Sequence, residues 1–174
     1  MPLPPLILAS ASPRRRELLR EHGYVFSVEP SEVAESAPRH LTPGEIVLRN
    51  ARAKAHAVAA RHPDALVLGV DTEVVFEDEV FGKPADLQAA FAMVQRLNGR
   101  AHAVYSGVWL CHRNGRWDDG FTEISRVHFR TLSAAQIRAY HARIGPLDKA
   151  GAYAAQDDGG ELIARVEEIG RAHV

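Results

Sequence analysis

The sequence predicts an α/β fold, because apolar runs typical of buried strands alternate with segments that carry helix-capping signals. Residues 66–70 (LVLGV) form a continuous apolar run, the pattern of a strand covered on both faces. Thr42 and Ser133 each begin a capping box, which Glu45 and Gln136 complete three residues later. We therefore expect capped helices to pack against a sheet in the core.

Six segments have the composition of strands. They are residues 6–8, 24–28, 66–70 (with 74–76 continuing extended), 102–111, 121–131 and 161–166. Residues 121–131 alternate in polarity, as in a strand with one buried face. An acidic turn follows residue 76, and residues 157–160 are expected to form another turn.

Four helices are expected, each with a residue that can cap its N-terminus. These caps are Ser12, Thr42, Asp86 and Ser133. Proline follows Ser12 and Thr42 at the first helical position, which favours proline. The last three helices are expected to end before Pro63, at Asn98-Gly99 and at Gly145-Pro146.

Length, composition and charge limit the class of protein. At 174 residues, with 46% hydrophobic and 25% charged residues, the chain is typical of a soluble globular domain. A net charge of −1 argues against nucleic-acid and membrane partners. No signal peptide or membrane-spanning run is found, so we expect a cytoplasmic protein. Cys111 is the only cysteine, which argues against a disulfide framework and a cysteine-based zinc site.

Three arginines occupy the first turn of the first expected helix, where positive charge is unfavourable. Each of Arg14, Arg15 and Arg16 opposes the helix dipole by roughly 0.3–1 kcal/mol if exposed. The backbone N–H groups of this turn form a natural anion site. A polyphosphate bound there, with the hydroxyls of Ser10 and Ser12 beside the guanidinium groups, explains both features. A solvated helix start is the alternative that the spacing leaves open.

Further charged residues match the requirements of phosphoryl transfer. Asp71 follows the apolar run, at the strand end where open α/β sheets bind ligands, and is a candidate general base or metal ligand. A turn-forming aspartate is the alternative. Lys54 shares a helix face with Val47, Ala51 and Val58, so it either faces a ligand or extends its stem to the surface. The complete set of candidates is Arg14, Arg15, Lys54, Lys83 and Lys149 as cations, with Asp71, Glu32 and Glu35 as carboxylates.

Other chemistries lack their motifs. A Walker A loop would need glycine where Glu77 stands, and no GxGxxG, HExxH or GxSxG motif is present. The motif of an aspartyl-phosphate phosphatase is also missing, because no second aspartate follows Asp71 two positions on. A nucleotide-phosphate site remains.

Five motifs extend this interpretation. They are Ser10-Ala11-Ser12-Pro13-Arg14-Arg15, Asp71-Thr72, Gly82-Lys83-Pro84, Gly99-Arg100 with His102, and Asp148-Lys149-Ala150-Gly151-Ala152-Tyr153 with Gln156. In this order, over about residues 6–166, they resemble the Maf family of house-cleaning nucleoside triphosphate pyrophosphatases. The resemblance implies a two-lobed, mixed-sheet α/β fold similar to inosine triphosphate pyrophosphatases, with a cleft between the lobes. It also implies Mg²⁺- or Mn²⁺-dependent hydrolysis of a nucleoside triphosphate to the monophosphate and pyrophosphate.

The resemblance also assigns roles to residues. Asp71 is implied to accept the proton of the attacking water, and the metal-side carboxylates are Asp71 and Glu32. The implied substrate-binding residues are Ser10, Arg14, Arg15, Lys54, Thr72, Lys83, Lys149 and Gln156. The partner is a small nucleotide, with no nucleic acid or membrane, and a homodimer is left open.

Specificity is expected to depend on Arg14, Thr72 and Gln156, which match the branch similar to dTTP/UTP pyrophosphatases. The branch that acts on 7-methyl-GTP has tryptophan and glutamine in place of Arg14 and Thr72. The amide of Gln156 can both donate to and accept from a uracil-type edge. A 7-methyl-GTP pyrophosphatase and a non-catalytic, nucleotide-binding regulator of cell division remain the alternatives.

The carboxyl end departs from the family pattern. We expect a single Maf-like domain over residues 1–167, without the last strand and helix of the family. Residues 168–174 fit no periodicity, and we expect them to be a non-native tail.

Overall fold

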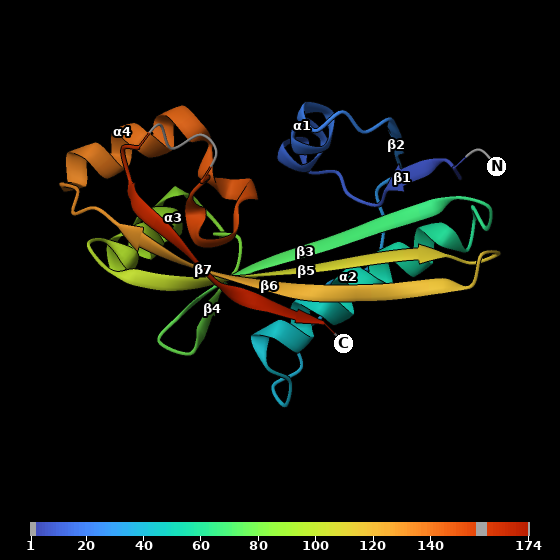
Figure 1. Cartoon of the computed structure of the whole chain (residues 1–174). Helices are drawn as coiled ribbons and strands as arrows, with labels where there is room; N and C mark the ends of the chain where they lie inside the picture. The colour runs from blue at the N-terminus through green and yellow to red at the C-terminus, as the bar shows by residue number, and fades with distance from the viewer. Residues whose placement is uncertain (1–2, 156–159, 174) are drawn as a thin grey trace. The chain divides into compact units, whose positions relative to one another are not determined.

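The structure is a computed structural model that describes residues 3–155 and 160–173, and it confirms the expected α/β class (Figure 1). The elements, in chain order, are β1 (Leu6–Leu8), α1 (Pro13–Glu21), β2 (Phe26–Val28), α2 (Pro43–Ala59), β3 (Leu66–Phe76), β4 (Glu79–Phe81), α3 (Leu87–Leu97), β5 (Ala101–His112), β6 (Trp117–Phe129), α4 (Ala134–Ile144), η1 (Pro146–Asp148), η2 (Ala150–Ala152) and β7 (Ile163–His173). Gln156 and the expected turn residues 157–159 lie outside the described part.

The described strands form one mixed sheet in the order β2-β1-β3-β5-β6-β7, with β4 paired to β3. β1 is parallel to both of its neighbours, with Leu6 opposite Phe26 on β2 and Leu66 on β3. β4 is antiparallel to β3, with Val75 opposite Val80. The parallel register places Leu8, the last residue of β1, opposite Leu68 on β3, so the chain after β1 starts close to residues 69–71 of β3.

The chain divides into two compact units. The first contains Met1–Asp71, Ser106–Glu123 and Arg171–Val174, and the second contains Thr72–Tyr105 and Ile124–Gly170. The existence of two units agrees with the expected two-lobed class.

In the first unit, α2 lies directly on the sheet, because two glycines leave room for its backbone. A Cβ atom on Gly69 of β3 would lie 2.1 Å from the carbonyl oxygen of Ala51. A Cβ atom on Gly107 of β5 would lie 2.4 Å from the backbone of Val47. This close contact between α2 and the sheet determines how near the polar side chains of α2 lie to β3.

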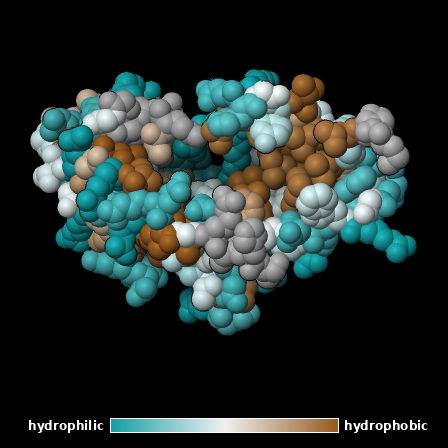
Figure 2. Space-filling model, in the orientation of Figure 1, coloured by the Kyte–Doolittle hydropathy of each residue, from teal (hydrophilic) through white to brown (hydrophobic). Residues whose placement is uncertain are grey.

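Only one face of β3 in the first unit is deeply buried, so the expectation of cover on both faces was wrong. Val67 and Gly69 are buried against α2, whereas Leu66, Leu68 and Val70 alternate with them and are half-buried. Figure 2 shows hydrophobic side chains gathered near β1 and the first part of β3, beside the more hydrophilic α1. An apolar run can therefore predict a strand correctly even where only one face of that strand is deeply buried.

The second unit has its own hydrophobic core, formed by strand residues and by the facing sides of α3 and α4. Its largest fully buried side chains include Leu97, Ile137 and Tyr140. Asp86 caps α3 through the N–H of Ala89, as expected. The helix ends are thus set by local hydrogen bonds, while the apolar faces set the packing.

Both predicted capping boxes are present. Thr42 accepts a hydrogen bond from the N–H of Glu45 at the start of α2, and Ser133 accepts one from the N–H of Gln136 at the start of α4. Ser12 does occupy the N-cap position of α1, but its side chain makes no capping hydrogen bond. The carbonyl oxygen of Ser12 accepts from the N–H of Arg16 at 3.3 Å, but the Ser12 side chain satisfies none of the N–H groups of this first turn.

Several strand boundaries differ from those expected. β2 begins at Phe26, and β6 begins at Trp117, because pairing with its neighbour β5 extends it through residues 117–120. The acidic turn is a two-residue hairpin connection at Glu77 and Asp78, whose φ angles are 50° and 63°. It leads into β4, a strand that the sequence pattern did not predict. β7 continues beyond residue 166 to His173 beside β6.

Among the described residues, no helix has the length and apolar character needed to cross a membrane.

His102 lies buried in the second unit, with Nε2 2.8 Å from the hydroxyl of Tyr153 and its ring edge-to-face with Phe129. Burial, with a small contribution from His128, lowers the pKa of His102 to about 4. The folded protein therefore keeps this imidazole neutral in mildly acidic solution.

We expect His102 to reduce the free energy of unfolding as the pH falls from 6.5 toward 4. In this window the unfolded chain protonates the imidazole and the folded chain does not, so proton uptake favours unfolding. The full effect is on the order of 3 kcal/mol. Urea unfolding across this range should give a shallower pH slope for His102→Gln than for the wild type, and equal slopes would contradict the assignment.

Candidate active site

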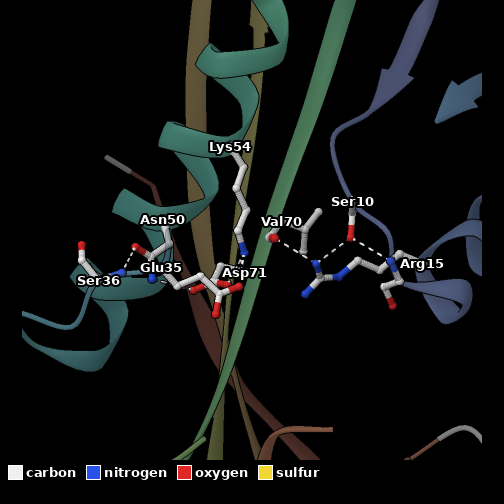
Figure 3. A network of polar contacts seen from close by, with 9 residues as sticks. Ser10, Arg15, Glu35, Ser36, Asn50, Lys54, Val70 and Asp71 are labelled. Atoms are coloured by element: carbon white, nitrogen blue, oxygen red, sulfur yellow. Dashed lines mark hydrogen bonds and ion pairs between the residues drawn. The ribbon is translucent and has the colours of Figure 1, made fainter. Parts of the chain in front are cut away.

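Asp71 is the centre of a polar cluster in the first unit (Figure 3). Its carboxylate is buried in the middle of β3, so the expectation that Asp71 lies at a strand end was wrong, because β3 continues to Phe76. Oδ1 accepts a hydrogen bond from Nζ of Lys54 at 2.6 Å, and Oδ2 accepts one from Nδ2 of Asn50 at 3.0 Å. Both donors belong to α2 and lie one helical turn apart. The carboxylate is thereby oriented, and its charge is compensated by the ammonium group.

Lys54 joins a second carboxylate to this cluster. Its Nζ donates to Oε1 of Glu35 at 2.7 Å, and the Glu35 side chain is 54% exposed. Beside it, the N–H of Ser36 donates to Oδ1 of Asn50 at 3.2 Å. The loop that precedes α2 is thus attached to the same helical turn that holds Asp71. Two carboxylates share one buried ammonium group.

Arg15 lies on the other side of β3 from Lys54 in the view of Figure 3. Its Nη1 donates to Oγ of Ser10 at 3.0 Å and to the carbonyl oxygen of Val70 at 2.9 Å. Burial lowers the pKa of the Arg15 guanidinium, while the charges of Asp71 and Glu35 raise it. The guanidinium remains a cation, because arginine is not deprotonated in proteins. A fixed positive charge therefore lies within electrostatic range of both carboxylates.

The start of α1 provides further donors. Its first turn contains no acidic residue, and Arg14, Arg15 and Arg16 are all half-buried there. Within the described chain, Nε of Arg16 is buried without a hydrogen-bond partner. A buried donor without an acceptor is costly, so an anion at this turn would remove an unfavourable feature as well as gain the helix N–H groups.

Of the expected site residues, the structure brings Ser10, Arg15, Lys54 and Asp71 together, with Arg14 next to them on α1. The interpretation of Lys54 as a surface lysine was wrong, because its ammonium group is buried in ion pairs. Glu32 is exposed, and among the described residues Glu35 rather than Glu32 makes the ion pair to the cluster.

The other expected site residues belong to the second unit. Thr72 is half-buried on β3, and Lys83 is exposed just after β4. Lys149 is buried, and its Nζ donates to the carbonyl oxygen of Gly145 at 2.9 Å and to Asp148 at 2.6 Å. It thus binds the C-terminal end of α4, in addition to any role in substrate binding. The roles of these residues stay predictions.

The sequence interpretation missed Asn50. A signal was present in the spacing, because Asn50 lies four residues before Lys54 and so shares its helix face; the structure shows that both are buried. A buried amide beside a buried ammonium indicates a common acceptor, which the structure identifies as Asp71.

The fold and the site together define an α/β protein with a buried carboxylate–ammonium pair near an arginine-rich helix start. The chain belongs to the Maf family, since residues 5–171 match the family model described as Maf-like protein. This confirms the family that the sequence motifs indicated.

Several curated relatives of the chain are named enzymes. The chain is 51% identical over 163 residues to the dTTP/UTP pyrophosphatase of Moorella thermoacetica, covering 93% of this chain and 84% of the relative. It is 48% identical over 162 residues to the dTTP/UTP pyrophosphatase of Myxococcus xanthus, covering 93% and 81%. The enzyme of the same name from Gloeobacter violaceus is 44% identical over 162 residues, covering 93% and 84%.

We expect Lys54→Met to lower the free energy of unfolding by about 3 kcal/mol, because Asp71 would remain buried without the ammonium group that pairs with it. Urea unfolding at neutral pH measures the change. Lys149→Met is a matched control, since Lys149 is equally buried but its partner Asp148 is 67% exposed and can be solvated. A loss in Lys54→Met no larger than that in Lys149→Met would show that the Asp71 pair is not a strong constraint.

Proposed function

We propose that this chain hydrolyses dTTP or UTP to the nucleoside monophosphate and pyrophosphate. The observation that carries the proposal is the buried Asp71, held by Lys54 and Asn50 beside the Arg15 guanidinium. The names of the relatives from Moorella thermoacetica and Myxococcus xanthus support the same substrates.

In this proposal, the triphosphate binds at the start of α1. The guanidinium of Arg15 is already oriented by Ser10 and Val70, so little side-chain freedom is lost when phosphate oxygens arrive. Arg14 and the N–H groups of the first turn add positive charge on the same side. Charge-assisted hydrogen bonds from arginine suit phosphate oxygens well. Lys83 and Lys149 are further candidates for phosphate binding.

Asp71 then serves as the proton acceptor. The oxygen of a water molecule attacks the α-phosphorus, the bond from that phosphorus to the bridging oxygen breaks, and pyrophosphate leaves with the electron pair. The proton of the water passes to the carboxylate of Asp71. Lys54 and Asn50 keep the carboxylate in one orientation, and orientation is a large part of such catalysis.

The donor set near Asp71 fits a hard divalent cation. Oxygen atoms of Asp71 and Glu35 approach the same ammonium group, so two carboxylates already face a common positive charge. Carboxylate oxygens are the ligands that Mg²⁺ and Mn²⁺ prefer. When bound, such a cation supplies neutralisation of the triphosphate charge. Asp71 and Glu35 are the residues that would hold it, with Glu32 of the same loop as the alternative carboxylate.

Base recognition is assigned to Thr72 and Gln156, together with Arg14. A pocket that pairs both the donor and the acceptor groups of a uracil-type edge can discriminate strongly, because a wrong base leaves buried polar groups unpaired.

Asp71→Asn should lower kcat for dTTP by about 100-fold or more, with a KM change below about threefold, because the amide keeps the shape but cannot accept the proton. Pyrophosphate release measures the rate. Asp78→Asn, in the exposed β3–β4 turn, is the control and should leave kcat unchanged. Wild-type protein that binds dTTP without releasing pyrophosphate would instead support a regulator that binds nucleotides without turnover.

A panel of nucleoside triphosphates tests the substrate. We expect kcat/KM for dTTP and UTP to exceed that for GTP and 7-methyl-GTP by at least about tenfold, a difference that paired polar contacts readily supply. A preference for 7-methyl-GTP would assign the chain to the other branch of the family.

A further inference from the structure

Three potential metal ligands converge in the first unit, outside the cluster around Asp71. They are His56 on α2, Cys111 on β5 and Asp118 on β6, and one ligand atom of each lies within 4.8 Å of the others. We propose that these residues form a second site, which binds a thiophilic divalent ion of the zinc type.

The exposed part of this cluster is already ordered. Oδ1 of Asp118 lies 2.7 Å from Nε2 of His56 and accepts a hydrogen bond from Nε1 of Trp109 at 2.5 Å. Oδ2 accepts one from Nη2 of Arg52 at 3.3 Å, and the Arg52 guanidinium lies 5.0 Å from the Trp109 ring centre. Trp109 and Arg52 thus position the carboxylate as neighbouring groups do around metal ligands. A metal ion would replace the direct contact between His56 and Asp118.

The three ligands also provide an entry path. The Cys111 thiol is buried at the inner end of the cluster, whereas the side chains of His56 and Asp118 are 45% and 36% exposed. An ion can therefore arrive from solvent and keep a water molecule as its fourth ligand, an arrangement common for zinc. Burial raises the pKa of the Cys111 thiol to about 11, so the metal-free site holds the protonated sulfur. On binding, the sulfur–metal bond forms and the thiol proton is released to solvent.

The ligand chemistry distinguishes this site from the cluster around Asp71. Thiolate and imidazole favour zinc and its spectroscopic substitute cobalt, whereas the carboxylates of Asp71 and Glu35 favour magnesium or manganese. The expectation that a single cysteine leaves no zinc site was based on the usual sets of several cysteines. The fold instead supplies His56 and Asp118 from elements distant in the sequence.

A bound ion would connect α2 to the β5–β6 hairpin. Because α2 also carries Lys54 and Asn50, the ion would stabilise the helix that holds Asp71 without touching the substrate. The expected consequence is a higher Tm in the presence of the metal, since a ligand that binds only the folded state raises its stability.

Cobalt(II) added to the full, reduced chain tests the proposal. We expect one equivalent to produce a thiolate-to-cobalt charge-transfer band and tetrahedral visible bands, which zinc abolishes and excess magnesium does not. Cys111→Ser should lose the charge-transfer band. His56→Gln and Asp118→Asn, at half-exposed positions, should weaken cobalt binding by at least about tenfold.

Asp71→Asn serves as the matched control and should leave the cobalt spectrum unchanged, because Asp71 belongs to the other cluster. Absence of a charge-transfer band in folded wild-type protein would overturn the proposal. A band of the same intensity and affinity in His56→Gln would do so as well, since the thiol would then be binding cobalt alone. Circular dichroism confirms that each variant is folded.

Discussion

The ion pair between Asp71 and Lys54 is the interaction on which the rest of the site depends. Burying two charges costs several kcal/mol per ion, and the cost is offset only when geometry is good and the remaining hydrogen-bonding positions are filled. Here Asn50 fills the second carboxylate oxygen and Glu35 shares the ammonium group. The pair also needs α2 close to β3, which the absence of side chains at Gly69 and Gly107 permits. The packing of a helix on a sheet thus determines where the carboxylate lies.

In the same arrangement, the Arg15 guanidinium and the Asp71 carboxylate are held by different partners and do not pair directly with each other. Arg15 donates to Ser10 and to the carbonyl oxygen of Val70, and Lys54 and Asn50 occupy the oxygens of Asp71. The guanidinium group is thus positioned by groups other than the carboxylate, although both lie in one electrostatic environment. Phosphate binding and proton acceptance can therefore be served by neighbouring residues that do not neutralise each other directly.

Features determined by local hydrogen bonds could be predicted from the sequence, and features determined by partners distant in the chain could not. The capping boxes at Thr42 and Ser133 depend on residues three positions away, and both are present. The first-unit residues Ser10, Arg15 and Asp71 were found because their motifs are contiguous. The helix-face pattern made Lys54 a candidate, but its burial depends on β3, and the cluster around Cys111 depends on α2 and β6, so local patterns left the first undecided and missed the second. Strand β4 likewise exists because a hairpin folds it onto β3.

The central claim is that the nucleotide's phosphates bind between the arginine-rich start of α1 and Asp71. Nitrogen-15 NMR of the side chains during titration with α,β-methylene-dTTP and magnesium tests it most directly, because the analogue binds but cannot be cleaved at this bond. The account predicts that the Arg15 guanidinium and Lys54 ammonium signals shift together and saturate, while the Trp109 indole signal stays in place. Saturating binding, seen in the phosphorus signals of the analogue, with unchanged Arg15 and Lys54 signals would contradict it.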